Sequence, residues 1–308
     1  MFRLAHISDI HLGPLPDVSY WELASKRITG YINWQRNRRH TIAEGIIEAI
    51  VKDMRDFEPS HIAVTGDLVN LALDREIDLA KTWLEILGHE AGVTLVPGNH
   101  DAYVPGALDK VCKAWGRYMT GDGATDPMGR NDFPFLRVRG PVAMIGLSSA
   151  RASAPFMASG YFPGEQERAA RHLLDATYER GLFRIVLIHH PPVRGATAPH
   201  KRLFGIGRFQ EMLENHGAEL VLHGHTHLPT THWLNGRMGR VPVVGVAAAG
   251  QAHGSAKPAA QYNLIDIDGE PGNWEVGLTR RGISGPDGAM ADIWSGPLVP
   301  GSDFPMFA

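Results

Sequence analysis

Cysteine is almost absent from this sequence, which has one, Cys112, in 308 residues. A single thiol excludes an intrachain disulfide and a cysteine-rich zinc site, and it suits a reducing compartment. No segment approaches the ~18 consecutive apolar residues of a membrane-spanning helix, and the opening MFRLAHISDIHLG lacks the basic and apolar regions of an export signal. We therefore expect a cytoplasmic protein that does not cross a membrane.

Neither sign of charge dominates, and no linker divides the chain. The 30 Lys and Arg residues and 33 Asp and Glu residues give a formal net charge of -3, so we expect no stable nucleic-acid partner. A hydrophobic fraction of 44% is enough for a large core. We expect one domain over 1–281, followed by a Gly- and Pro-rich tail over 282–308 that is wrapped on the surface or partly disordered.

The first hundred residues alternate between β-rich and helical patterns. Strands are expected at 2–8, 61–67 and 93–98, separated by amphipathic helices at 40–57 and 74–87. This order predicts an α/β sheet. Further strands are expected at 135–140, 142–149, 184–190, 219–225, 231–236, 241–249, 262–268 and 273–281, with helices near 163–174 and 207–217.

Polar side chains recur where the expected core strands end, which is the edge where open α/β sheets bind ligands. They are Asp9, His11, Asp67, Asn99, His100, Asp101, His189, His190, His223, His225 and His227. Each one alone is explained as a turn residue, a helix cap or a hydrogen-bonded histidine. Together they lie beside apolar residues and glycines, and burying so many polar groups is costly unless something binds them.

Metal ions fit this set of donors. Carboxylate, amide and imidazole groups suit Mn, Fe, Zn or Co better than a thiolate-selected ion or calcium. Seven such ligands are too many for one tetrahedral centre and suit two centres that share a carboxylate. Two metals about 3.5–4 Å apart serve displacement at phosphorus. The expected cofactors are therefore two divalent or trivalent transition metals, Mn2+, Fe2+/Fe3+ or Zn2+.

The ordered motifs DIH, GD, GNHD, a later H and GHTH, from Asp9 to His227, resemble those of the calcineurin-like metallophosphoesterase superfamily. The resemblance implies a four-layer α/β/β/α sandwich of two mixed β-sheets flanked by helices, with a two-metal site at the strand ends. It also implies a role for each ligand. Asp9, His11 and His227 would hold one metal, Asn99, His189 and His225 the other, and Asp67 would bridge them.

His100 is placed by the same resemblance next to the metals without being a ligand. A cationic imidazole there would attract phosphate and protonate the departing alkoxide. Asp101 is expected either to orient that ring or to cap a helix. Asn99 is expected to contact substrate as well as metal, while His190 and His223 are expected to support the ligands or to be structural.

Departures within the motifs distinguish this sequence from two branches of the superfamily. The Asp-Arg-Gly element and terminal Glu of the superfamily's protein phosphatases are missing, and Asn70 stands where purple acid phosphatases have a tyrosine. The pattern is most similar to bacterial phosphodiesterases acting on cyclic nucleotides, glycerophosphodiesters or lipid-precursor pyrophosphates. We expect a phosphodiesterase that uses a metal-bridging hydroxide with His100 as general acid. The alternatives are a nuclease, a lipid-precursor pyrophosphate hydrolase and a non-catalytic scaffold, the last disfavoured by the complete ligand set.

Two further segments are expected to lie near substrate. The insertion 13–40 leaves the first motif, and a helix from Tyr20 would gather aromatic residues on one face beside Lys26, Arg36, Arg38 and Arg39. It is interpreted as a lid over the site, a cap packed on its own domain, or a membrane-surface helix over 20–39 that would place the protein at the inner membrane. The segment after His190 offers Arg194, His200, Lys201 and Arg202 as substrate contacts, or is a solvated loop.

Overall fold

The computed structural model describes residues 1–35, 45–126 and 128–300 and contains two six-stranded sheets. In the first sheet the order is β14 (Met290–Pro297), β13 (Asn273–Ile283), β12 (Gln261–Glu270), β1 (Phe2–Ile7), β2 (His61–Val64) and β3 (Val93–Leu95). In the second it is β10 (Thr231–Gly236), β11 (Gly239–Gly245), β9 (Leu220–His223), β7 (Phe183–Leu187), β5 (Val142–Gly146) and β4 (Phe135–Arg139). A small third sheet pairs β6 (Gly160–Tyr161) with β8 (Leu203–Phe204).

Both large sheets are mixed. Strands β1, β2 and β3 are parallel, whereas β12, β13 and β14 form an antiparallel extension joined to β1. Strands β5, β7, β9 and β11 are parallel, with β4 and β10 antiparallel at the two edges. The carboxyl ends of the parallel strands therefore deliver their loops to one edge of each sheet, where the polar motifs lie.

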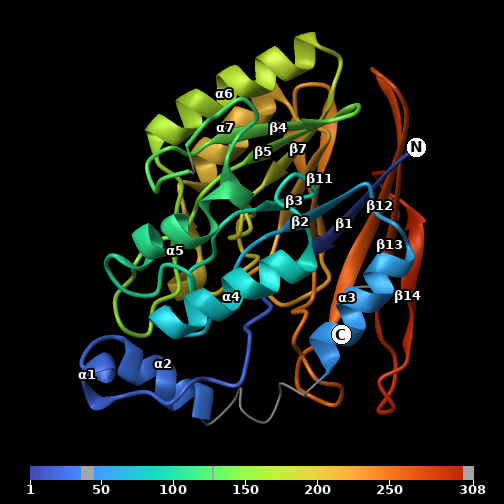
Figure 1. The fold of residues 1–308 in the computed structure, drawn as a ribbon. Helices are drawn as coiled ribbons and strands as arrows, with labels where there is room; N and C mark the ends of the chain where they lie inside the picture. Colours follow the sequence, from blue (N-terminus) through green and yellow to red (C-terminus); the bar gives the residue numbers. More distant parts are fainter. Residues whose placement is uncertain (36–44, 127, 301–308) are drawn as a thin grey trace.

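Helices cover the sheets (Figure 1). Helices α3 (Ile46–Asp56), α4 (Asp74–Leu87) and α5 (Ala107–Trp115) pack with the first sheet in the larger core. Helices α6 (Gly164–Glu179) and α7 (Ile206–His216) pack with the second sheet in the smaller core. The expected α/β fold with two mixed, helix-flanked sheets is confirmed. Among the described residues, no helix has the length and apolar content to cross a bilayer.

Strand β7 shows why the centre of the second sheet forms where it does. Its Ile185 and Leu187 pack into the larger core between the sheets, whereas Val186 and Ile188 pack into the smaller core under α6 and α7. Burial on both faces explains the uninterrupted apolar run from Ile185 to Ile188, whereas the buried Arg184 at the start of the strand pairs with Glu219 at 2.8 Å.

The segment after Arg281 differs from the expected tail. Strand β13 continues to Ile283, and Met290–Pro297 pairs with it as edge strand β14. An edge position tolerates the glycine and proline that suggested irregular structure, because only one side of the strand is hydrogen-bonded. Within this edge Trp294 packs against the larger core. Residues 301–308 of the expected tail lie outside the described residues.

The insertion also differs from the single helix expected from Tyr20. Helix α1 (Tyr20–Leu23) and helix α2 (Arg27–Asn33) are separated by a break, so the proposed aromatic face is not continuous. Tyr20 and Trp21 are 92% and 90% exposed, whereas Trp34 is buried. The arginines at 36, 38 and 39 and the start of the helix expected at 40–57 lie outside the described residues.

Candidate metal centre

The loops that follow β1 and β2 run side by side beyond the end of the sheet. The backbone amides of Asp9 and His11 donate to the carbonyls of Gly66 and Asp67, each at 3.0 Å. Leu12 continues the pairing by donating to the carbonyl of Leu68 at 2.8 Å. Sequence positions almost sixty residues apart are thereby held in register, and the carboxylates of Asp9 and Asp67 come to one place.

Strained backbone is concentrated in the loops that carry the expected ligands, which follow β1, β2 and β9. Asp9, His11, Asp67, His225 and His227 all have positive φ angles, between 45° and 68°. This left-handed conformation is uncommon for residues with a side chain and costs about 1–3 kcal/mol in each case. All five belong to the ligand set expected from sequence, so the strain falls where side chains are turned toward a common point.

Two glycines allow the loops to approach the carboxylates. A Cβ on Gly98 would lie 2.1 Å from Asp67 Oδ1, and a Cβ on Gly224 would lie 2.6 Å from Asp9 Oδ2. Neither distance is compatible with a side chain. The glycines of the GNHD and GHTH motifs are therefore required by the geometry of the centre.

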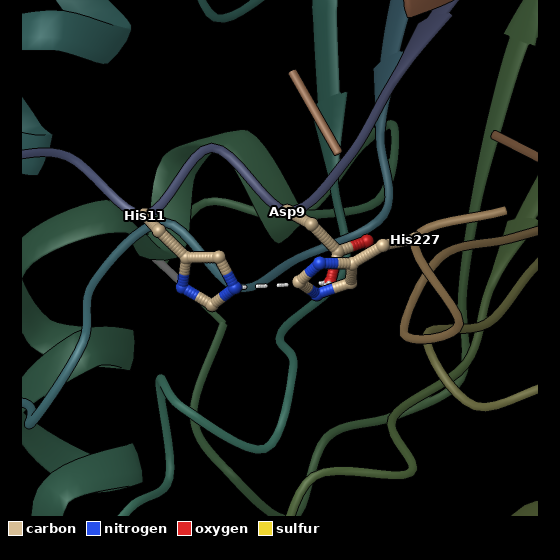
Figure 2. Close-up of side chains that lie close together, drawn as sticks. All are labelled: Asp9, His11 and His227. Carbon is tan, nitrogen blue, oxygen red and sulfur yellow. Dashed lines mark ion pairs between the residues drawn. The ribbon is translucent and has the colours of Figure 1, made fainter. Parts of the chain in front are cut away.

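Asp9, His11 and His227 form the first group of possible metal ligands, and Figure 2 shows their side chains directed toward one another. Asp9 Oδ1 lies 3.1 Å from His227 Nε2 and 4.0 Å from His11 Nε2. This oxygen is buried and has no hydrogen-bond partner among the described residues, although Asp9 Oδ2 accepts from the amide of His225 at 2.9 Å. A buried oxygen of this kind fits a cation.

Asp67 joins this group to a second one. It clusters with His189 and His225, and also with His11 and His100. Its Oδ2 lies 3.3 Å from His189 Nε2 and 3.9 Å from His11 Nε2. Asn99 Oδ1 lies 3.2 Å from His189 Nε2. The structure thus brings together all seven ligands expected from sequence, with Asp67 between the two groups, and the clusters are consistent with a two-metal site.

Backbone carbonyls hold the rings of three expected ligands. His189 Nδ1 lies 2.6 Å from the carbonyl oxygen of Thr65, and His11 Nδ1 lies 3.1 Å from that of Val69. On the other side, His225 Nε2 lies 3.0 Å from the carbonyl oxygen of Lys201. A ring nitrogen that donates to a carbonyl fixes the tautomer, which leaves the opposite nitrogen as an acceptor for a metal.

The charges in the centre depend on one another. Burial opposes ionisation of both carboxylates, yet the imidazoles of His227 and His189 hold the pKa values of Asp9 and Asp67 well below their usual range. Burial likewise opposes the charge on His189, but the carboxylate of Asp67 raises its pKa to about 9. A bound metal would replace these protons as the positive partner. The donor set therefore fits two cations.

Asp101 lies behind the centre. Its carboxylate is buried and accepts hydrogen bonds from the backbone amides of Asp67, Leu68 and Gly98 at 2.8–2.9 Å. Burial, together with the charge of Asp67, raises its pKa to about 7. The ring of His100 instead has its Nδ1 2.6 Å from the carbonyl oxygen of Asn70. The orienting contact expected from Asp101 is therefore made by Asn70, and Asp101 fixes the loop that carries Asp67.

Replacing this anchor provides a stability test. Asp101→Asn places an amide N–H against backbone N–H groups, so we expect the free energy of unfolding of the metal-free protein to fall by roughly 3 kcal/mol. Denaturant unfolding measures this change. The exposed Asp78→Asn variant is the control and should stay within about 0.5 kcal/mol of the parent protein. An equally small effect at Asp101 would show that its hydrogen bonds do not hold the loop.

A pocket of about 420 Å³ opens beside the centre. Its described lining residues come from the insertion, the loops that follow β2 and β3, and two later segments: Lys26, Thr29, Gly30, Ile32, Asn33, Trp34, Asn70, Asn99, His100, Tyr103, Phe156, Met157, Ala158, His200 and Lys201. The substrate contacts expected from Arg194 and Arg202 are not among them. Arg202 lies over the ring of Phe204, 4.5 Å from its centroid. Of the contacts expected from this loop, His200 and Lys201 do line the pocket.

Sequence reasoning missed several residues around the centre. The ring of Tyr103 stacks on His100, with centroids 5.3 Å apart and planes 18° apart. Glu76 accepts from the amide of Asn70 at 2.8 Å and so shapes the loop that holds His100. Ser149 was also missed: its Oγ lies 2.7 Å from one ring nitrogen of His190, and the other ring nitrogen lies 3.1 Å from the carbonyl oxygen of Ala158. Only Tyr103 had a sequence cue, its position three residues after His100.

Comparison with known proteins adds three findings. A family model described as calcineurin-like phosphoesterase matches residues 2–229. A dimetal phosphatase from Danio rerio has a similar structure, with a TM-score of 0.58, 13% identity, and coverage of 91% of this chain and 95% of that one. The purple acid phosphatase PPD1 from yellow lupin has a TM-score of 0.56 and 12% identity, over 94% of this chain and 52% of that one.

The chain thus spans about half the length of the lupin enzyme. Identities this low establish a shared fold and nothing finer. No curated protein matches the chain.

Proposed function

Because this chain belongs to the calcineurin-like phosphoesterase family, which residues 2–229 match, we propose that it is a metal-dependent phosphodiesterase. The observation that carries the proposal is the convergence of buried Asp and His clusters on Asp67. Carboxylates and imidazoles on both sides of one shared carboxylate match what two neighbouring cations require. When bound, the metals would supply Lewis acidity and a nucleophile at neutral pH.

Each residue of the centre has its own role in this proposal. Asp9, His11 and His227 would hold one metal, Asn99, His189 and His225 the other, and Asp67 both. His100 stands beside the centre with Nδ1 directed at the Asn70 carbonyl, so a second proton would lie on Nε2. In that state the ring attracts the phosphate and donates a proton to the leaving oxygen.

The pocket supports an organic phosphoester as the substrate. It begins at Asn99 and His100 and extends under Lys26 and Trp34 of the insertion, which gives room for an organic group beyond the scissile phosphate. A volume of about 420 Å³ lies within the range of small-molecule sites. Either a monoester or a diester could place an organic group there, so the choice of a diester rests on the resemblance of the motifs to those of bacterial phosphodiesterases.

Hydrolysis of nitrophenyl esters tests the diester assignment. The purified protein loaded with Mn2+ should have a higher kcat/KM for bis-nitrophenyl phosphate than for nitrophenyl phosphate. Cyclic nucleotides, glycerophosphodiesters and nucleotide-linked lipid precursors extend the panel to natural leaving groups. A preference for the monoester would overturn the diesterase proposal while leaving metal-dependent hydrolysis intact.

The insertion is proposed as a substrate-facing lid. Arg27 fastens it to the loop of Asp67 by donating to the carbonyls of Leu71 and Ala72 at 2.9 and 2.6 Å. Trp34→Ala should therefore raise KM about tenfold for a large diester and less for bis-nitrophenyl phosphate, since one apolar wall of the pocket is lost. Trp21→Ala is the matched control, because Trp21 is exposed and is not among the described lining residues. Equal losses on both substrates, with a lower Tm, would identify Trp34 as core packing instead.

A further inference from the structure

The pocket beside the centre has an unbalanced charge. Two of its described lining residues, Lys26 and Lys201, carry a positive charge, and none is an aspartate or glutamate. A partly enclosed space with cations and no acid among its described lining residues favours an anionic occupant.

Lys26 is held in a position that suits such an occupant. Its Nζ donates to Ser153 Oγ and to the carbonyl oxygen of Met157, both at 2.8 Å, and lies 4.6 Å from the ring centroid of Tyr103. These partners are uncharged, and an ammonium has three N–H donors. Burial lowers the pKa of Lys26 to about 8. Among the described residues, no carboxylate contributes to that shift and none lines the pocket.

Lys201 lies on the same wall of the pocket. Lys26 donates to the carbonyl of Met157. The next residue, Ala158, donates its amide to the carbonyl of His200 at 3.0 Å, and Lys201 follows His200 in the chain. The carbonyl of Lys201 meets the ring of His225, so the residue also adjoins the centre. Its ammonium is exposed and makes no hydrogen bond or ion pair with the described part of the chain.

We propose that this wall binds a second anionic group, a phosphate or carboxylate, carried by the organic part of the substrate. The inference rests on the proposed function, because one phosphate must occupy the centre for the second group to reach the lysines. It assigns the substrate class as phosphodiesters with an additional anion, such as those derived from nucleoside bisphosphates or diphosphates. Esters with a cationic group such as choline are disfavoured, since that group would face Lys26 and Lys201.

Two synthetic esters that differ only in the second anion test this inference. The nitrophenyl ester of thymidine 5'-phosphate and the same ester with an added 3'-phosphate share a leaving group, a scissile phosphorus and a nucleoside. The parent protein should have the higher kcat/KM for the 3'-phosphorylated ester. Lys26→Met and Lys201→Met should each reduce that preference about tenfold to a hundredfold, which is the effect of losing one hydrogen bond to a charged group. Lys81→Met, on the exposed face of α4, should retain it.

The outcomes separate the inference from the proposed function. Absence of metal-dependent hydrolysis of both esters and of bis-nitrophenyl phosphate would overturn the proposed function. Hydrolysis of both esters with equal kcat/KM would overturn the second-anion inference alone. Because Lys26 also ties the insertion to Met157, Lys26→Met can lower activity by loosening that contact. Lys201→Met decides that case, and an unchanged preference in this variant would contradict the inference.

Discussion

Asp67→Ala is expected to lose both metals, which is the largest effect that the structure predicts. The carboxylate faces His189 and His11 from opposite groups, and its Oδ1 accepts the amide of His100 at 2.7 Å. Removing a contact that merely supports a ligand costs about 10–100-fold in metal affinity, so losing a shared ligand should cost more. Elemental analysis after gel filtration should fall from a value approaching two metals per chain toward zero, and hydrolysis should disappear with it.

Two controls make this result interpretable. Asp74→Ala removes an exposed carboxylate that pairs with Lys110 at the surface of the protein, and it should retain metal and activity. Circular dichroism of Asp67→Ala separates metal loss from unfolding, because the sheets and helices do not depend on this side chain. A folded Asp67→Ala protein that still holds two tightly bound metals would refute the assignment of Asp67 as the shared ligand.

His100→Ala is expected to keep both metals and lose turnover. Loss of a general acid typically costs about 10²–10⁴-fold in rate. The loss should be smaller for nitrophenolate, which leaves without a proton, than for an alkoxide. Metal analysis is essential here because His100 lies close enough to His11 and Asp67 to count among the possible ligands. Loss of a metal would identify it as a ligand, and equal losses for both leaving groups would argue against an acid.

The sequence was sufficient for most core strands and helices and for which candidate ligands lie together. Helix α4 and strand β10 coincide with the predicted segments 74–87 and 231–236, since each has a clear period and turn residues at both ends. The candidate ligands could be recognised for a related reason. Each follows a short apolar strand directly, where a polar side chain has no role in the core, and parallel strands deliver such ends to one edge.

Edges and insertions were predicted less well. Strand β14 was missed because an edge strand needs neither continuous apolar residues nor freedom from glycine and proline. The break between α1 and α2 was missed because the aromatic spacing suits one helix as well as two. In both segments the local pattern is weak, and packing against the rest of the domain decides the conformation.

What the sequence alone determined, then, is which side chains meet: the carboxylates, the amide and the imidazoles of the strand-end motifs. Only the tertiary structure decided how they are held. The supports of His189 and His11 are the carbonyls of Thr65 and Val69, 124 and 58 residues away along the chain. Every residue has a backbone carbonyl, so this role cannot be predicted from the residue type. The task of Asp101 was decided in the same way, because the amides of Asp67 and Leu68, 34 and 33 residues away, join that of nearby Gly98 at its carboxylate only after the loops have folded together.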